Sequence, residues 1–280
     1  MSIYRNRRVS LATRHAKELA IARPLRVLGL ETIVPADLDT DALGTFSGEI
    51  PRDGAPRDVC LRKARLGMAV TGLRLGIASE GSFGPHPFVP FVPAGHEIMT
   101  FVDDERGLIV TESMWAKWTN YNHVEVSGFD ELVEWLPKVR FPSHALMVWP
   151  KSNRAAVEKG IETHNALKTA VERAALASSD GIAWVATDMR AHVNPSRMST
   201  IRRLAFRLAR RLATPCPRCG TPGWGRTDFV TGLPCEMCGT STEQIKAEVF
   251  TCVACDCRDE RPRSDGLVRT PAQNCPYCNP

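Results

Sequence analysis

Eight of the ten cysteines form four Cys-x-x-Cys pairs in the last quarter of the chain. A Cys-x-x-Cys turn directs two sulfur atoms at one point, and two such turns complete the tetrahedral thiolate set that Zn2+ prefers. Four turns therefore predict two structural zinc sites, because closed four-sulfur sites stabilise folding and leave no position open for a substrate. The pairs are Cys216/Cys219, Cys235/Cys238, Cys252/Cys255 and Cys275/Cys278.

The spacing of the pairs leaves their assignment to the two sites open. Successive pairs are separated by 15, 13 and 19 residues, each enough for a hairpin or a short loop. We expect sequential pairing, which joins the first two turns and the last two. The alternative is nested pairing, which joins the two inner turns and the two outer ones. Cys257 is either a spare thiol or an alternative ligand, and a redox role for the pairs is the less favoured chemistry.

Composition is that of an ordinary globular protein, with 43% hydrophobic and 24% charged residues. The net charge of +5 is too small to require a polyanionic partner. The basic segment at residues 1–8 is followed by no long apolar run, and no stretch approaches the length of a membrane-spanning helix. We therefore expect a cytoplasmic protein without a membrane partner, in which reduced thiols bind metal instead of forming disulfides.

Residues 1–213 alternate short apolar runs with helical patterns, which predicts an α/β domain, and residues 214–280 form the cysteine module. A turn at residues 103–107 indicates an antiparallel hairpin, so we expect a mixed sheet with flanking helices. Strands are expected over residues 8–13, 31–34, 73–79, 97–102, 108–111, 145–149 and 182–186. Helices are expected over residues 16–28 (interrupted near Pro24), 56–70, 129–139, 163–177 and 198–212.

Two polar clusters in the first 52 residues are candidate ligand-binding segments. The first follows a strand at its turn into a helix, where a hydroxyl, cationic side chains and helix-start amides would hold a phosphate. The second is a long loop over residues 40–52, and long loops in compact domains are often functional. A capped helix with solvated charges is the alternative for the first. The candidate ligand-binding residues are Thr13, Arg14, His15, Lys17, Asp41, Thr45 and Glu49.

Two further clusters follow later strands, where open α/β sheets bind ligands. In residues 78–87, Glu80 is flanked by glycine and could hold a hard cation such as Mg2+. Residues 187–197 could complete an anion- or metal-binding pocket. The alternatives are a glycine–proline turn and a helix cap with surface ion pairs. Candidate residues beside Glu80 are Ser79, Ser82 and His86, and those of the later cluster are Asp188, Arg190 and His192.

The sequences of these polar clusters resemble those of an uncharacterised bacterial family, a domain of unknown function. The shared motifs are Ser-Glu-Gly-Ser-Phe-Gly-Pro-His-Pro at residues 79–87, Thr-Asp-x-x-Gly-Thr-Phe-x-Gly-Glu at residues 40–49 and Thr-Asp-Met-Arg-Ala-His at residues 187–192. The resemblance covers nearly the whole chain, cysteine pairs included, and it implies no activity.

The order of elements also resembles, more distantly, the inosine-triphosphate pyrophosphatase and Maf-like superfamily, which hydrolyses nucleoside triphosphates with Mg2+. Residues 11–17 are similar to its first strand, hydroxyl-bearing turn and lysine. Residues 58–64 are similar to its Glu-Asn-Ala-x-x-Lys-Ala helix, and residues 77–81 take the place of its acidic strand end. The chain departs from the superfamily at Val59-Cys60, which replaces Asn-Ala, and at a single Glu80 in place of an acidic pair.

Our first hypothesis is therefore a Mg2+-dependent hydrolase of a nucleotide or another phosphorylated small molecule. Thr13, Arg14 and Lys17 would hold phosphates. Glu80, with Asp58 or Asp188, would bind the metal and orient water. Lys63 would face the site from its helix, so the candidate catalytic residues are Glu80, Asp58, Lys63 and His86.

The alternative is a non-enzymatic zinc-binding protein. Its cysteine module and the helix that precedes it would contact nucleic acid or a protein partner. A zinc-stabilised scaffold without a reactive pocket is the third possibility. The helix carries Arg202, Arg203, Arg207, Arg210 and Arg211.

Overall fold

The structure is a computed structural model that describes residues 2–36, 38, 54–154 and 157–280. It divides into two compact units, Met1–Leu208 and Ala209–Pro280, here called the N-terminal and C-terminal units. The division falls inside helix α4 (Pro195–Ala213), and the sequence places the boundary at the end of this helix. Among the residues that the structure describes, no helix combines the length and apolar content needed to cross a bilayer.

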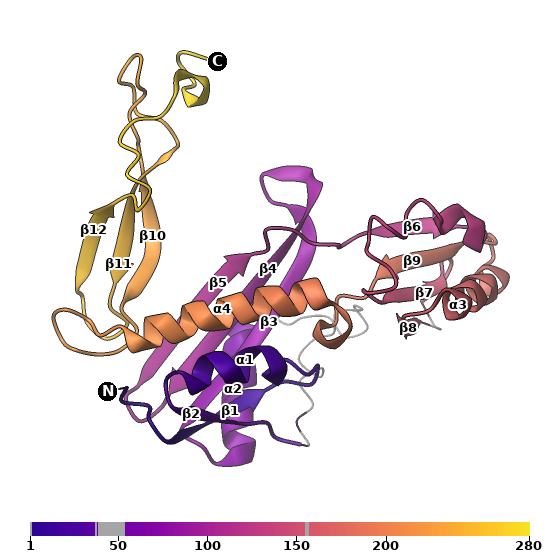
Figure 1. The fold of residues 1–280 in the computed structure, drawn as a ribbon, viewed down its shortest axis with the longest axis horizontal. Helices are drawn as coiled ribbons and strands as arrows, with labels where there is room; N and C mark the ends of the chain where they lie inside the picture. Colours follow the sequence, from indigo (N-terminus) through magenta and orange to yellow (C-terminus); the bar gives the residue numbers. More distant parts are fainter. Residues whose placement is uncertain (1, 37, 39–53, 155–156) are drawn as a thin grey trace. The chain divides into compact units, whose positions relative to one another are not determined.

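The N-terminal unit contains a five-stranded mixed sheet with the strand order β2-β1-β3-β4-β5 (Figure 1). Strand β1 pairs in parallel with β2 and β3, whereas β3, β4 and β5 are antiparallel. The expected mixed sheet is confirmed. Its strands are β1 (Arg7–Ala12), β2 (Leu30–Ile33), β3 (Leu75–His86), β4 (Val89–Asp103) and β5 (Leu108–Trp115).

Helices cover both faces of this sheet. Helix α2 (Pro56–Thr71) begins with proline in its first turn and is followed by Gly72 at φ 66°, a conformation that favours glycine. Its buried Cys60 and Ala64 pack with Ala78 and Ile98. Because side chains alternate along a strand, Glu97, the residue before Ile98, points to the opposite face, where it binds Arg197 of α4.

Two of the expected helices differ from the prediction. Helix α1 (Glu18–Arg26) contains Pro24 and ends two residues after it. The helix expected over residues 129–139 is a single 3-10 turn, η2 (Phe129–Leu132), followed by turns. Pro137 has no backbone N–H to donate to a helical hydrogen bond, which disfavours a continuous helix at this point.

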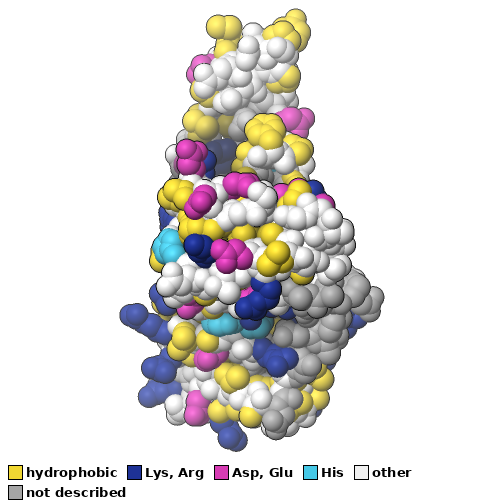
Figure 2. Space-filling model, turned by 90° about the vertical axis from the view of Figure 1, so that its right-hand side faces the viewer, with side chains coloured by type: hydrophobic (Ala, Val, Ile, Leu, Met, Phe, Trp, Pro, Cys, Tyr) yellow, Lys and Arg dark blue, Asp and Glu magenta, His cyan; other side chains and the backbone are white. Residues whose placement is uncertain are grey.

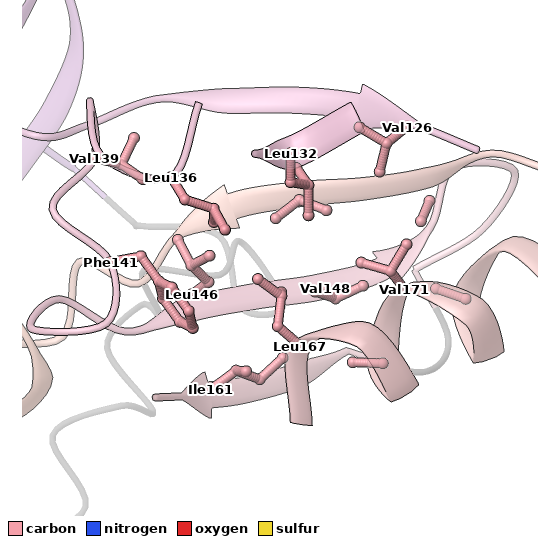
Figure 3. Close-up of a cluster of buried hydrophobic side chains, with 14 residues drawn as sticks. Val126, Leu132, Leu136, Val139, Phe141, Leu146, Val148, Ile161, Leu167 and Val171 are labelled. Carbon is pink, nitrogen blue, oxygen red and sulfur yellow. The ribbon is translucent and has the colours of Figure 1, made fainter. Parts of the chain in front are cut away.

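A second sheet lies in the same unit, with the strand order β6-β9-β7-β8 and antiparallel pairing throughout. Helix α3 (His164–Ala177) packs on one face, and its Thr163 cap accepts a hydrogen bond from the Ala166 N–H at 3.3 Å. Apolar side chains, among them Leu146, Leu167 and Val171, fill the space between helix and sheet (Figure 3). The sequence did not predict β6 or β8. The strands are β6 (His123–Val126), β7 (Leu146–Pro150), β8 (Glu158–Ile161) and β9 (Ala183–Thr187), and η3 (Ala191–Val193) follows them.

The C-terminal unit is built on three antiparallel strands in the order β10-β11-β12. Gly225 at the start of β10 pairs with Thr251 at the end of β11, and Ala247 near the start of β11 pairs with Pro262 at the end of β12. One strand therefore separates each cysteine pair from the next. The elements are β10 (Gly225–Thr231), β11 (Ile245–Thr251), β12 (Arg258–Pro262) and η4 (Ala272–Asn274).

Candidate functional site

The eight paired cysteines form two four-sulfur groups in the C-terminal unit. Within each group, all sulfur atoms lie within 4.8 Å of one another. The Sγ atoms of Cys219 and Cys252 are 3.7 Å apart, and those of Cys235 and Cys278 are 4.0 Å apart. A tetrahedron with Zn–S bonds of about 2.3 Å has edges of about 3.8 Å, whereas a disulfide needs about 2.05 Å. The two groups therefore fit zinc. They are Cys216, Cys219, Cys252 and Cys255, and Cys235, Cys238, Cys275 and Cys278.

The pairing of the turns is interleaved, which corrects both arrangements considered from the sequence. The first turn joins the third, and the second joins the fourth. The antiparallel sheet is the reason, because successive strands run in opposite directions and each cysteine pair lies one strand after the last. The first and third turns therefore lie at one end of the sheet, and the second and fourth lie at the other.

Hydrogen bonds prepare individual thiols for metal binding. Bonds with the side chain and then the backbone of Thr240 lower the pKa of Cys238 to about 6, and Cys238 Sγ lies 3.2 Å from Thr240 Oγ1. Thr221 lowers the pKa of Cys219 to about 6 in the same way. The neighbouring Cys238 in turn raises the pKa of Cys278 to about 12. Four crowded thiols cannot all ionise alone, so a bound cation would be the group that allows it.

Cys257 lies outside both four-sulfur groups in the part of the chain that the structure describes. Its carbonyl oxygen accepts a hydrogen bond from the Cys252 N–H at 3.0 Å, so its backbone supports the third cysteine turn. The half-buried thiol of Cys257 is therefore not one of the eight sulfur atoms that form the two groups.

In the N-terminal unit, buried charges gather where β1 ends. Ala12, the last residue of β1, pairs with Ala78, and β3 continues for eight more residues. Lys17 lies in the turn after β1, and its Nζ donates to the Ser79 carbonyl oxygen at 3.0 Å. Burial, and next the cation of Arg197, lower the pKa of the Lys17 amine to about 8, against the opposing effect of the carboxylates of Glu80 and Glu97.

Two buried ion pairs flank this lysine on opposite faces of the sheet. Lys63 of α2 binds Glu80 at 2.8 Å on one face. Arg197 of α4 binds Glu97 at 2.7 Å on the other, and both of these side chains are 1% exposed. Gly81 pairs with Glu97, and a Cβ at this glycine would lie 2.6 Å from Arg197 Nη2. Because Gly81 has no side chain, the Glu97–Arg197 ion pair can occupy the space next to it.

Two buried hydroxyl groups beside Lys17 have no hydrogen-bond partner among the described residues. They are Thr13 Oγ1 and Ser79 Oγ, in residues that are 7% and 3% exposed. The register of Ala12 with Ala78 places Thr13, just after the end of β1, beside Ser79 within the adjacent parallel strand β3. Buried polar atoms normally have a partner, so these two hydroxyls are available to a ligand.

The other candidate ligand-binding residues have varied positions. His15 stacks on the exposed His192 at 5.2 Å between ring centroids, which brings the first and fourth polar clusters together. Arg14 is exposed and Ser82 is half-buried on β3. Asp41, Thr45 and Glu49 lie outside the described residues.

The three remaining acidic or imidazole candidates have different surroundings. Asp188 is fully buried, but its carboxylate is bound by Arg190 at 2.6 Å and accepts a hydrogen bond from the Gly160 N–H at 3.1 Å. Asp58 is exposed in the first turn of α2, five positions before Lys63 and so about 140° around the helix from it. His86 ends β3, about 20 Å along the strand from Glu80, because β3 continues past the turn expected after Ser79.

Glu97 is a site residue that the sequence-based selection missed, and its partner Arg197 was noted only as part of the polar cluster at residues 187–197. Glu97 begins a predicted strand and so reads as a surface acid, whereas its hydrogen bond to Arg197 joins positions that are 100 residues apart. The only available signal was an acid within an otherwise apolar strand pattern, since burying a carboxylate requires a cationic partner.

The family model described as "Domain of unknown function (DUF6671)" matches residues 63–280. The chain belongs to this family. The matched region begins at Lys63 and contains Glu80, Glu97, Arg197 and all of the cysteine turns. No curated protein and no solved structure matches the chain, so the distant resemblance to the inosine-triphosphate pyrophosphatase and Maf-like superfamily gains no support from them.

Proposed function

We propose that this DUF6671 protein binds a phosphorylated small molecule, such as a nucleotide, where β1 ends beside the middle of β3, and hydrolyses it. In this proposal the two four-cysteine groups hold structural zinc. The observation that carries the proposal is the buried Lys17 amine next to two hydroxyls, Thr13 and Ser79, that lack partners among the described residues. An amine and hydroxyls that converge where a parallel strand ends are suited to phosphate oxygens.

Glu80 is the proposed acid–base residue. A phosphate group that attracts Lys63 would free the Glu80 carboxylate, now 2.8 Å from Lys63 Nζ, to accept a proton from water. The water oxygen would form a new bond to phosphorus as the bond to the leaving oxygen breaks. Asp188 and Asp58 are assigned no part, because one is bound by Arg190 and the other points away from Lys63.

Magnesium enters this proposal with the substrate. Among the described residues, close groups of three or more metal-ligating side chains are formed only by the cysteines. Mg2+ commonly keeps several waters and takes oxygens from substrate phosphates, so one carboxylate such as Glu80 would suffice.

The test is a thermal-shift screen of the zinc-loaded chain with nucleotides and sugar phosphates, with and without Mg2+, followed by phosphate-release assays. We expect Lys17→Met to abolish the ligand-induced shift and the exposed control Lys168→Met to retain it. Glu80→Gln should bind ligand and lose about 100-fold or more in turnover. A Lys17→Met variant that binds normally would refute the site, and full turnover by Glu80→Gln would remove that residue from the mechanism.

Charges give less support to a nucleic-acid partner. Residues 209–280 contain nine Lys and Arg against eight Asp and Glu, and each zinc–tetrathiolate centre would add a net charge of about −2. On α4, Arg207 binds Glu112 at 2.6 Å and the buried Arg211 donates to the Gly223 carbonyl oxygen. The face drawn in Figure 2 likewise shows basic, acidic and apolar side chains interspersed.

A further inference from the structure

The β3–β4 hairpin extends beyond the rest of its sheet (Figure 1). The last residue of β5, Trp115, pairs with His96, and beyond this point the hairpin continues as two strands to the pairs Pro85–Pro93 and His86–Val89. Residues 85–93 are here called the hairpin tip. The tip rises about 10 Å above the Pro85–Pro93 pair, which is three residues of extended chain.

The hairpin tip presents apolar side chains to solvent. Phe88 and Phe91 are each 88% exposed, and Val92 is 43% exposed. Residues 81–95 contain no Asp, Glu, Lys or Arg, so no charged group within the segment solvates these rings. Concentrated exposed apolar surface of this kind marks an interaction site in soluble proteins.

The backbone of the tip is better suited to insertion into lipid than to pairing with a strand of a partner protein. Four of the nine tip residues are prolines, which have no N–H group. The Phe88 N–H is already bonded to Nδ1 of His86 at 3.2 Å, and His86 is the only polar side chain in the tip. Pairing with a partner strand uses main-chain N–H groups, whereas hydrocarbon penalises every N–H that lacks an acceptor.

The base of the tip has the composition of a membrane interface. Trp115 is 49% exposed, and its ring lies 5.6 Å from the His86 ring. Two positions on, Lys117 is exposed and forms no ion pair with the described residues. Arg140 lies over the exposed Trp118 ring at 3.9 Å. Tryptophans collect at the level of lipid headgroups, and nearby cations attract anionic lipids.

We propose that the hairpin tip inserts into the surface of an anionic lipid bilayer, with Phe88 and Phe91 as anchors and Lys117 at the headgroups. An insertion of about 10 Å matches the depth of surface-bound amphipathic segments. The sequence-based expectation of no membrane partner rested on the length of apolar runs, which detects a spanning helix but not a short inserting hairpin. The tip lies apart from the β1–β3 site, so the inference does not depend on the proposed hydrolase.

The test is co-sedimentation of the zinc-loaded full chain with vesicles of phosphatidylcholine, alone or mixed with phosphatidylglycerol. We expect binding to the mixed vesicles and a loss of about tenfold for each phenylalanine removed, so about 100-fold for Phe88→Ser/Phe91→Ser. Lys117→Glu should weaken binding to the mixed vesicles at least fivefold. Leu176→Ser is the matched control, because Leu176 is 89% exposed but lies on α3, and it should bind like wild type.

A wild-type chain that stays in the supernatant with both kinds of vesicle overturns the proposal. So does a Phe88→Ser/Phe91→Ser variant that binds as wild type does. Analytical ultracentrifugation without lipid tests whether the tip instead binds a second copy of the chain. Wild-type sedimentation that depends on protein concentration, and a double variant that lacks this dependence, would assign the tip to self-association and overturn the lipid proposal. Equal zinc content and melting temperature in all variants exclude misfolding as the cause.

Discussion

The two units bring polar groups together inside the protein in different ways. In the N-terminal unit, the buried cations Lys63 and Arg197 have carboxylate partners in the same chain, and the surrounding core is large. In the C-terminal unit, eight thiols converge without any cationic partner of their own, and few apolar side chains are buried around them. The N-terminal unit supplies both charges of each ion pair from its own side chains, whereas the thiolates of the C-terminal unit require a bound metal ion.

Zinc removal should have the largest effect and should affect the two units differently. We expect a chelator to unfold residues 209–280 while the N-terminal unit stays folded, because structural zinc sites contribute on the order of 10–16 kcal/mol of apparent binding energy. Elemental analysis should first give two zinc ions per chain, as the two four-sulfur groups require. Hydrogen exchange followed by peptide mass would then show loss of protection confined to the C-terminal unit. Uniform loss over the whole chain would contradict the independence of the units.

Interleaved pairing can be tested by removing one thiol from each of two turns. Cys219→Ser/Cys252→Ser should lose one zinc ion and retain the other, because both residues belong to the same four-sulfur group. The matched variant Cys219→Ser/Cys238→Ser removes a thiol from each group and should lose both ions. Sequential pairing requires the opposite results, so elemental analysis of these two proteins decides between them.

Breaking the ion pair between Glu97 and Arg197 should cost the N-terminal unit about 3–5 kcal/mol. Arg197→Met leaves the Glu97 carboxylate buried at 1% exposure without this partner. The double variant Glu97→Gln/Arg197→Met should recover much of the loss, since no charge then remains uncompensated between these two positions. Urea unfolding of the zinc-loaded proteins measures both effects. Equal stability of the single variant and wild type would show that the pair is not buried in solution.

The buried amine of Lys17 should make the free energy of unfolding depend on pH. Its pKa is lowered from 10.5 to about 8 by burial and next by Arg197, so the unfolded chain binds more protons than the folded chain between these values. Stability should therefore rise as pH increases from about 8 to about 10.5, by about 3 kcal/mol. Lys17→Met should lack this rise, and the exposed control Lys168→Met should keep it. An identical pH profile for Lys17→Met and wild type would contradict a buried amine.

The sequence identifies which residues bind metal or carry charge better than it identifies the residues with which they interact. The cysteine turns are local, so the ligand residues are identifiable from spacing alone, whereas their pairing depends on three strands that the sequence did not predict individually. Strand β3 was expected to stop at Ser79 because glycine and proline follow, but its pairing with β4 continues it to His86. This error placed His86 in the candidate site.

Long-range ion pairs were beyond the reach of sequence patterns for a different reason. Alternation of apolar and polar residues identifies the side of a strand that is buried, but it does not reveal which cation will reach a buried acid. Lys63 was selected through the superfamily resemblance and Glu80 from its local context, and the structure joins them. The partner of Glu97 lies 100 residues away on α4, and only the packing of that helix against the sheet reveals it.

The crossed arrangement of the cysteine turns has a consequence for biosynthesis. A chain leaving the ribosome cannot complete its first zinc centre until Cys255 has emerged, and by then the second turn is already present with two unsatisfied thiols. The second centre must wait until Cys278. For this interval the nascent protein carries a half-built metal site, so truncation between these two cysteines would leave one finished centre beside a reactive dithiol.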